Sequence, residues 1–242
     1  MNPRMHARPK PEAAGLGSAA AVLWDVDGTL LTSGGVAARA FLKAVEHVTG
    51  RAPLPDGIEF GGRIDPEIAA LLLATVEHDE EHVPAVLERL HHLVQLDLET
   101  LRAQTRVLPG VRELVGRLAG AGVRQTVVTG NIRSVAAAKL GSTSLVPPIE
   151  LEPGGYGDSA ATRADVARAA LLALFGEGWA DHTADCWIIG DTPRDLACAR
   201  AVGLRCALVA TGRTPVEALT GIGADVVLSG LEAPGDVHLL WG

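Results

Sequence analysis

The spacing of hydrophobic positions changes twice along the 242-residue chain, and these changes predict its elements. Residues 20–24 form a short uninterrupted apolar run, which is typical of a parallel strand buried on both faces. Over residues 36–106 the apolar positions recur at helical spacing, and that stretch contains no strand candidate. From residue 107 onward, short apolar runs alternate with helical patterns. This alternation predicts a doubly wound parallel sheet with right-handed crossovers.

The same changes predict how the chain divides into domains. We expect an α/β, Rossmann-like core made of residues 20–34 and 107–242, with an all-helical cap domain of residues 35–106 inserted after the first strand. Residues 1–19 are expected to be a flexible leader, because their basic residues are not followed by the apolar region that a signal peptide needs.

Chain breakers and helix-start signals set the expected bounds of the elements. Asp65 followed by Pro66 is a typical helix start, with Asp as the N-cap and Pro at the first helical position. The helices expected in the cap cover residues 36–50, 65–76 and 84–104. The later strands expected in the core cover residues 123–128, 149–151, 186–189, 205–209 and 225–228, and the helices between them cover residues 110–118, 131–140 and 159–175, with another from residue 192.

Two carboxylates, Asp25 and Asp27, directly follow the first strand, and Gly28 then lets the chain turn sharply. Residues two apart on a strand point to the same side, so we expect the pair to lie together at the carboxyl end of the strand, where open α/β sheets bind ligands. Two such charges repel by roughly 4 kcal/mol at an effective dielectric near 20. The pair therefore indicates a bound cation or a chemical role.

Two further strand ends carry polar residues. The segment Thr129, Gly130 and Asn131 follows one predicted strand, and Asp191 follows another and lies four residues before Asp195. The carboxyl ends of parallel strands lie on one edge of a sheet, so these groups are expected to converge. Carboxylate oxygens are the ligands that Mg²⁺ prefers. The mixture of carboxylates with hydroxyl and amide donors predicts a site for a phosphoryl group and Mg²⁺.

Taken together, these segments resemble the motifs of the haloacid dehalogenase-like (HAD) superfamily, in its phosphoglycolate-phosphatase-like branch with a helical cap. Residues 25–30 (DVDGTL) match the first motif in full, and residues 129–131 (TGN) resemble the second. Arg163 stands where the third motif usually has Lys, and residues 190–195 (GDTPRD) resemble the fourth. The resemblance extends over residues 20–231.

The resemblance implies a role for each of these acidic residues. Asp25 would be the nucleophile that forms an aspartyl-phosphate. Asp27 would be the general acid for the leaving alcohol and then the base for water, with its main-chain carbonyl on the metal. Asp191 would join Asp25 as a side-chain ligand of Mg²⁺. Asp195 would orient metal-bound waters or Arg163.

The resemblance also implies donors for the phosphoryl oxygens. Thr129 and the amides near Gly130 and Asn131 would bind them at a helix N-terminus. Arg163 would stabilise negative charge on the substrate and on the intermediate. Lys139, by contrast, lies too early in the chain for the third motif, and no Lys lies between it and Asp191.

Plainer interpretations of some residues stay open. Asp195 has the spacing to form a capping box with Thr192, and Thr129 could simply cap a helix. Arg63 lies in a glycine-rich cap loop that could approach the site and meet an anionic substrate, or it could be an ordinary surface arginine.

The composition of the chain argues against a nucleic-acid or membrane partner. With 21% charged residues, a net charge of -8 and no basic stripe, the chain is typical of a soluble globular protein without a nucleic-acid partner. No apolar run reaches the ~20 residues of a membrane span. Cys186, Cys198 and Cys206 lie in apolar elements and are expected to be reduced and buried, which indicates the cytoplasm. The oligomeric state stays open.

We therefore expect a Mg²⁺-dependent phosphatase for a small phosphomonoester, with phosphoglycolate as a candidate substrate. A sugar-phosphate mutase would share its first steps. A phosphonate hydrolase would need a Schiff-base lysine, for which the cap offers Lys43 alone. A dehalogenase would have no use for Asp27, because halide leaves without an acid. A non-catalytic binding module would have no use for the carboxylate cluster.

Overall fold

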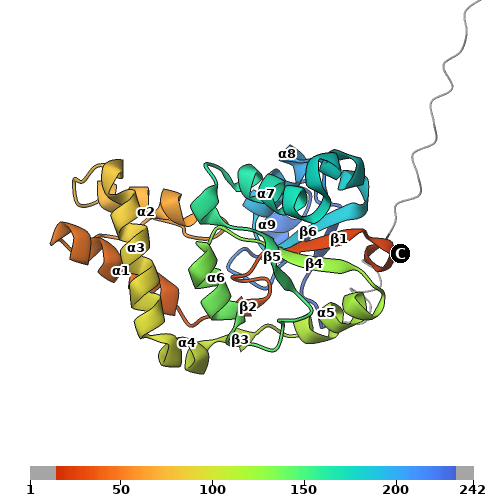
Figure 1. The fold of residues 1–242 in the computed structure, drawn as a ribbon, viewed down its shortest axis with the longest axis horizontal. Helices are drawn as coiled ribbons and strands as arrows, with labels where there is room; N and C mark the ends of the chain where they lie inside the picture. Colours follow the sequence, from red (N-terminus) through yellow and green to blue (C-terminus); the bar gives the residue numbers. More distant parts are fainter. Residues whose placement is uncertain (1–14, 233–242) are drawn as a thin grey trace, which may run out of the picture.

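A six-stranded parallel sheet forms the centre of the protein (Figure 1), in a computed structural model that describes residues 15–232. The spatial order of its strands is β5-β4-β1-β6-β7-β8. The predicted doubly wound α/β fold is therefore confirmed. The strands are β1 (Ala21–Trp24), β4 (Arg124–Val128), β5 (Glu150–Gly155), β6 (Cys186–Gly190), β7 (Arg205–Val209) and β8 (Val226–Leu228).

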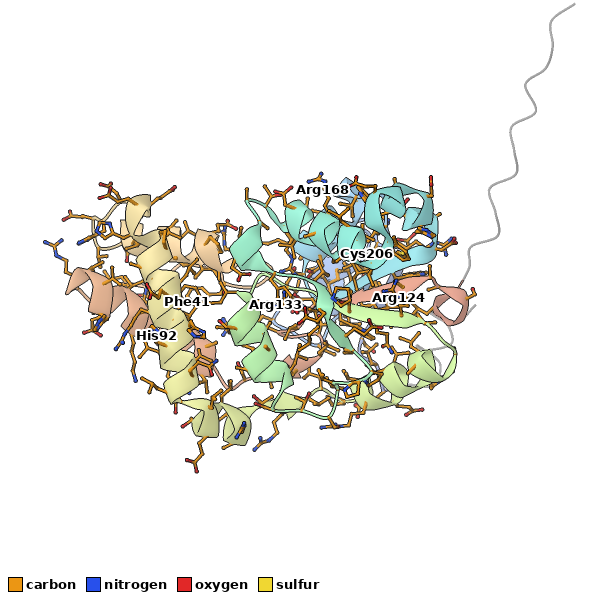
Figure 2. The ribbon with its side chains drawn as sticks, in the orientation of Figure 1. Phe41, His92, Arg124, Arg133, Arg168 and Cys206 are labelled. Atoms are coloured by element: carbon orange, nitrogen blue, oxygen red, sulfur yellow. The ribbon has the colours of Figure 1, made fainter. Side chains whose placement is uncertain are left out.

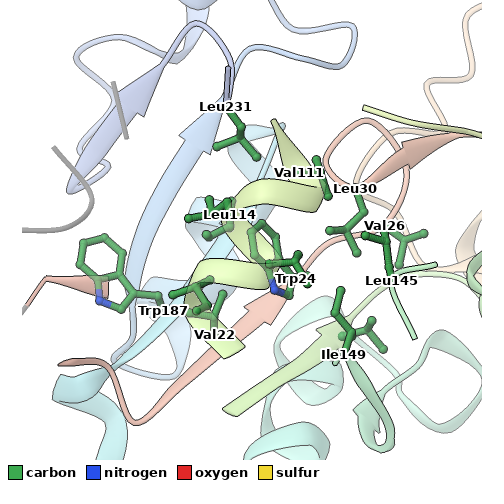
Figure 3. Close-up of a cluster of buried hydrophobic side chains, with 14 of the residues drawn as sticks. Val22, Trp24, Val26, Leu30, Val111, Leu114, Leu145, Ile149, Trp187 and Leu231 are labelled. Carbon is green, nitrogen blue, oxygen red and sulfur yellow. The ribbon is translucent and has the colours of Figure 1, made fainter. Parts of the chain in front are cut away.

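Strand β1 lies in the middle of this sheet, paired on its two sides with β4 and β6. All four of its residues are fully buried, which explains the apolar run. Val22 and Trp24 point to one face of the sheet, where they join a cluster that includes Val111 and Leu114 (Figure 3). Leu23 points to the opposite face and joins a second cluster. The sheet is thus packed on both faces.

Two layers of helices cover the sheet. Helices α5 and α6 pack on the face of Trp24, and α7 and α8 pack on the face of Leu23 (Figure 1). This arrangement leaves the carboxyl edge of the sheet open to the helices of the predicted cap. The bounds of the covering helices are α5 (Val111–Gly120), α6 (Arg133–Leu140), α7 (Arg163–Phe175) and α8 (Pro193–Ala201), with a short α9 (Val216–Leu219) near the last strand.

The segment between β1 and α5 contains four α-helices joined by turns and loops, with two short strands at its base. Strands β2 (Leu31–Thr32) and β3 (Arg106–Val107) pair antiparallel and bring its two ends together. Its helices share one apolar cluster, in which the ring of Phe41 packs edge-on against Phe60 at a centroid distance of 6.2 Å (Figure 2). The four helices are α1 (Val36–Thr49), α2 (Asp65–Ala74), α3 (Val83–Leu96) and α4 (Leu98–Gln104).

Several predicted bounds were wrong. The helix expected over residues 84–104 is broken at Asp97, whose backbone leaves the helical region and separates α3 from α4. The helix expected from residue 159 begins at Arg163, because Thr162 caps it and forms a capping box with Asp165. Strand β5 is longer than expected: it includes Pro153, which is tolerated because β5 is an edge strand.

The sequence predicted Asp65 as the N-cap of α2, and this was wrong. Helix α2 begins at Asp65, and Ile64 is its N-cap. The expected leader is described in part: residues 1–14 lie outside the described residues, but Leu16 is fully buried in a core cluster and belongs to the folded structure.

Cys186, Cys198 and Cys206 are free and buried, as predicted. Within residues 15–232, no helix has both the length and the apolar composition to cross a membrane.

Candidate active site

Three buried polar residues directly follow the three central strands. Asp25 follows β1, Thr129 follows β4 and Asp191 follows β6, and each is at most 5% exposed. The amide of Asp25 continues the sheet by donating to the carbonyl of Ile189, at 2.9 Å. Because β1 is flanked by β4 and β6, all three residues meet at one edge of the sheet, as the sequence predicted.

Asp25, Asp191 and Asp195 form a buried carboxylate cluster, in which one oxygen of each lies within 4.8 Å of the others. Gly28 and Gly212 leave room for Asp191, since a side chain at either glycine would collide with its Oδ2 atom. Gly28 also has a positive φ of 84°, which glycine adopts without strain. A close group of hard oxygen ligands fits Mg²⁺.

Arg163 links two members of this cluster from the first turn of α7. Its Nη2 atom lies 2.5 Å from Oδ1 of Asp25 and 2.6 Å from Oδ1 of Asp195, and its side chain is 11% exposed. Asp195 also forms the capping box, because its Oδ2 accepts hydrogen bonds from the amide and hydroxyl of Thr192. Asp195 therefore contacts Arg163 through one carboxylate oxygen and forms the capping box through the other.

The electrostatics of the cluster favour a bound cation. Burial raises the pKa of Asp25 to about 7, against the lowering effect of Arg163. Burial, together with the charges of Asp25 and Asp195, raises the pKa of Asp191 to about 8. Burial alone would lower the pKa of Arg163, but the neighbouring Asp195 and Asp25 raise it overall, so it stays charged. Burial thus favours the protonated forms of Asp25 and Asp191, and a bound cation would favour their charged forms.

The loop after β4 contacts the predicted cap at Asp65, through one main-chain donor and one side-chain acceptor of that residue. The amide of Asp65 donates to the carbonyl of Gly130 at 2.7 Å, and the amide of Ile132 donates to Oδ2 of Asp65 at 2.8 Å. Gly130 lies so close to the carbonyl of Arg63 that a side chain at Gly130 would collide with it. The glycine-rich cap loop thus approaches the site, as expected.

The side chain of Arg63 is held within the cap. Its guanidinium forms an ion pair with Glu67, and its Nε atom donates to the carbonyl of Glu59 at 2.8 Å. The side chain keeps 21% of its surface exposed. The main chain of Arg63 therefore reaches the edge of the site, while its charge is paired with Glu67 in the first turn of α2.

Asp27 lies apart from the buried cluster. Its carboxylate is 42% exposed, and Oδ2 accepts from Nζ of Lys139 at 2.5 Å and from Nδ2 of Asn131 at 2.8 Å. Asn131 Nδ2 also donates to Oγ1 of Thr129 at 3.0 Å. Thr129 and Asn131 thus lie beside Asp27, at the edge of the sheet where the sequence predicted them.

Lys139 is a site residue that the sequence analysis set aside as lying too early in the chain. It lies in α6, only 3% exposed, and its neighbours one helical turn back, Val135 and Ala136, are buried. A lysine on the buried face of a helix needs an acceptor. Because α6 starts two residues after Asn131, a lysine on its buried face was the sequence signal for a position near the site.

Comparisons with known proteins agree with this geometry. Residues 22–200 match the family model of haloacid dehalogenase-like hydrolases. A phosphoglycolate phosphatase from Caulobacter vibrioides is 30% identical to this chain over 225 residues, or 89% of each sequence. The chain therefore belongs to the haloacid dehalogenase-like hydrolase family. It is an enzyme, a phosphatase of that family, and the predicted resemblance is confirmed.

Solved structures show the same fold. A structure described as a predicted phosphatase from Clostridium acetobutylicum has a TM-score of 0.67 at 20% identity, and the match covers 88% of this chain and 95% of that one. CbbY from Rhodobacter sphaeroides in complex with phosphate has a TM-score of 0.64 at 23% identity, covering 92% and 99%. At these identities the two structures bear on the fold alone.

Proposed function

We propose that this enzyme is a Mg²⁺-dependent phosphatase that hydrolyses a small phosphomonoester through an aspartyl-phosphate on Asp25. The observation that carries the proposal is the buried cluster of Asp25, Asp191 and Asp195 at the sheet edge, with Arg163 bound to two of its members. Such a cluster is costly unless it holds a cation or performs chemistry.

Asp25 is the proposed nucleophile. Arg163 binds its Oδ1 atom, which leaves the other oxygen to attack phosphorus. The new bond joins that oxygen to phosphorus, and the bond from phosphorus to the alcohol oxygen breaks. Asp25 and Asp191 would hold Mg²⁺ through their carboxylates, together with the main-chain carbonyl of Asp27. When bound, the metal supplies positive charge to the phosphoryl oxygens.

Asp27 is the proposed general acid and base. Its exposed carboxylate lies outside the buried cluster, so it can meet both the leaving alcohol and water. It gives a proton to the alcohol oxygen in the first step. In the second step it takes a proton from the water that attacks the aspartyl-phosphate, which releases inorganic phosphate and restores Asp25.

The loop after β4 is the proposed phosphate-binding segment. Oγ1 of Thr129 accepts from the main-chain amide and the side-chain amide of Asn131, at 3.3 Å and 3.0 Å, so its own proton is free for a phosphoryl oxygen. The main chain at Gly130 would lie beside the phosphoryl group, and the N-terminus of α6 would add a favourable dipole. Arg163 would stabilise the charge that develops on the transferred group.

Phosphoglycolate is a candidate substrate, on the strength of the homologue from Caulobacter vibrioides. We propose Arg63 as a residue that binds an anionic group of the substrate, which would have to compete with Glu67 for the guanidinium. The free, buried cysteines suit a reducing compartment, and we propose a cytoplasmic location.

The test is a phosphate-release screen over many phosphomonoesters, with Mg²⁺ and with a chelator. We expect Mg²⁺-dependent release that Asp25→Asn abolishes, and burst kinetics that reveal the covalent intermediate. Wild-type turnover by Asp25→Asn would refute the nucleophile assignment. Undiminished turnover with excess chelator would refute the metal dependence.

A further inference from the structure

Lys139 is buried where a lysine is costly, and both of its acceptors belong to the proposed machinery. It is 3% exposed, and its Nζ atom lies 2.5 Å from Oδ2 of Asp27 and 2.6 Å from Oδ1 of Asn131. Burying an ammonium carries a desolvation penalty of several kcal/mol unless it is well paired. Neither acceptor lies in the carboxylate cluster, so the pairing is separate from the one made by Arg163.

The chemistry of the ammonium fixes the orientation of Asn131. A lysine can only donate, so the Asn131 atom facing Nζ is the carbonyl oxygen. The amide nitrogen must then face Asp27 and Thr129, to which it donates at 2.8 Å and 3.0 Å. With the amide reversed, its nitrogen would face the ammonium and its oxygen would face a carboxylate. Lys139 therefore determines which way Asn131 points.

The same contacts fix the carboxylate of Asp27. Lys139 and Asn131 both donate to Oδ2, and among residues 15–232 no hydrogen bond reaches Oδ1. A half-exposed carboxylate with one neutral partner would have several rotamers available. A short charge-assisted hydrogen bond from a buried, immobile donor restricts it to one. Oδ1 is then the oxygen available for proton transfer.

Helix α6, which carries Lys139, also contacts the proposed cap. It lies between the sheet and the helices of the proposed cap (Figure 1), and its N-cap Ile132 and its residue Val135 belong to the apolar cluster of those helices. The helix thus packs against the sheet on one side and against the cap helices on the other, so the Lys139 side chain extends from a rigid support.

We infer that Lys139 is a positioning residue that holds Asp27 in place for proton transfer and aligns Asn131 with Thr129. This inference rests on the proposed function, in which Asp27 protonates the leaving alcohol. If Lys139 acts through Asp27, replacing Lys139 should lower kcat/KM most for substrates whose leaving group needs a proton. A lysine with a purely structural role would affect all substrates alike.

The test compares two esters by kcat/KM, which includes the step that expels the alcohol. One is p-nitrophenyl phosphate, whose leaving group needs little protonation, and the other is the best alkyl phosphate from the screen. For the alkyl ester we expect Asp27→Asn to cost at least ~100-fold. Lys139→Met is expected to cost ~10- to 100-fold. Both losses should be much smaller for the nitrophenyl ester, and Lys139→Met should add little in the Asp27→Asn background.

Two further variants serve as controls for this test. Lys43→Met, an exposed lysine on α1, is the matched control and should leave both kcat/KM values unchanged. Lys139→Gln keeps a donor without the charge and is the second variant, with thermal melting followed for every protein.

The outcomes are distinct. Equal losses for both esters would overturn the inference, as would full additivity with Asp27→Asn, or the absence of a cooperative melting transition in both Lys139 variants. If the wild-type enzyme releases no phosphate from any ester, the proposed function fails first.

Discussion

Oδ2 of Asp65 accepts a 2.8 Å hydrogen bond from the amide of Ile132, and this contact joins the first turn of α2 to the start of α6. The carboxyl group that makes it is buried beneath the cap loop. Burial raises its pKa to about 7, although the Ile132 amide and the charge of Lys139 act in the opposite direction. The seam between the proposed cap and the core therefore contains an acid that titrates near neutral pH.

We expect the stability of the protein to fall as Asp65 loses its proton. In the unfolded chain the carboxyl has an ordinary pKa of 3.8, whereas in the folded protein its pKa is raised to about 7. The folded state thus binds the proton more tightly, and its advantage is complete below about pH 4 and is lost as the pH rises through about 7. The loss amounts to a few kcal/mol at most.

Asp65→Asn mimics the protonated acid and should flatten this part of the profile. Urea unfolding across this pH range, without metal, measures the slope. Asp79→Asn, an exposed acid in the cap, is the control and should keep the wild-type slope. An Asp65→Asn profile as steep as that of the wild type would show that the slope arises elsewhere.

Mg²⁺ binding should release protons near neutral pH. Burial raises the pKa of both Asp25 and Asp191, and a metal ion binds the deprotonated carboxylates. Calorimetric titration in two buffers of different ionisation enthalpy measures the release directly. Asp191→Asn should weaken binding by more than ~10-fold, the lower bound found even for outer-shell partners of metals. Asp181→Asn, an exposed acid, should bind Mg²⁺ as the wild type does.

Removing the charge of Arg163 should harm both stability and activity. Arg163→Met leaves Asp25 and Asp195 buried without their cation, and breaking such a pair typically costs about 3–5 kcal/mol. Arg163→Lys keeps the charge but not the planar fork, so we expect intermediate stability and intermediate kcat. Arg168→Met, which breaks an exposed pair on the same helix, should cost less than ~1 kcal/mol. Equal melting temperatures for Arg163→Met and the wild type would contradict this account.

A side chain at Gly130 should displace the cap loop. The Cβ atom of Gly130→Ala would collide with the carbonyl of Arg63, so the loop must move and the contact between Gly130 and Asp65 must weaken. We expect a loss of kcat/KM that exceeds the loss of stability. Gly116→Ala is the control, since nothing lies within 4 Å of the added atom and alanine favours helix α5. Full activity in Gly130→Ala would show that close approach of this loop is dispensable.

Much of the site followed from local sequence. Asp25, Thr129 and Asp191 each follow an apolar strand, and the topology of a parallel sheet is enough to bring strand ends together. Arg163 was found through the resemblance, because nothing in its own neighbourhood marks it as a partner for residues 138 positions away.

The features that sequence reasoning missed depend on three-dimensional packing. Lys139 matters because of the direction in which one face of α6 points, which its distance along the chain does not reveal. Asp65 has the local signature of an N-cap, but a contact with Ile132, 67 residues away, uses its carboxylate instead. The length of β5 likewise depends on its pairing with β4, which extends to Gly155.

The cap loop meets the core largely through its backbone: the amide of Asp65 binds the carbonyl of Gly130, and the carbonyl of Arg63 lies against the same glycine. A backbone interface does not change when neighbouring side chains are exchanged. Other residues can therefore replace Arg63 over evolutionary time while this loop keeps its position against Gly130. Such an enzyme can acquire a new substrate preference without having to rebuild the contact between this loop and Gly130.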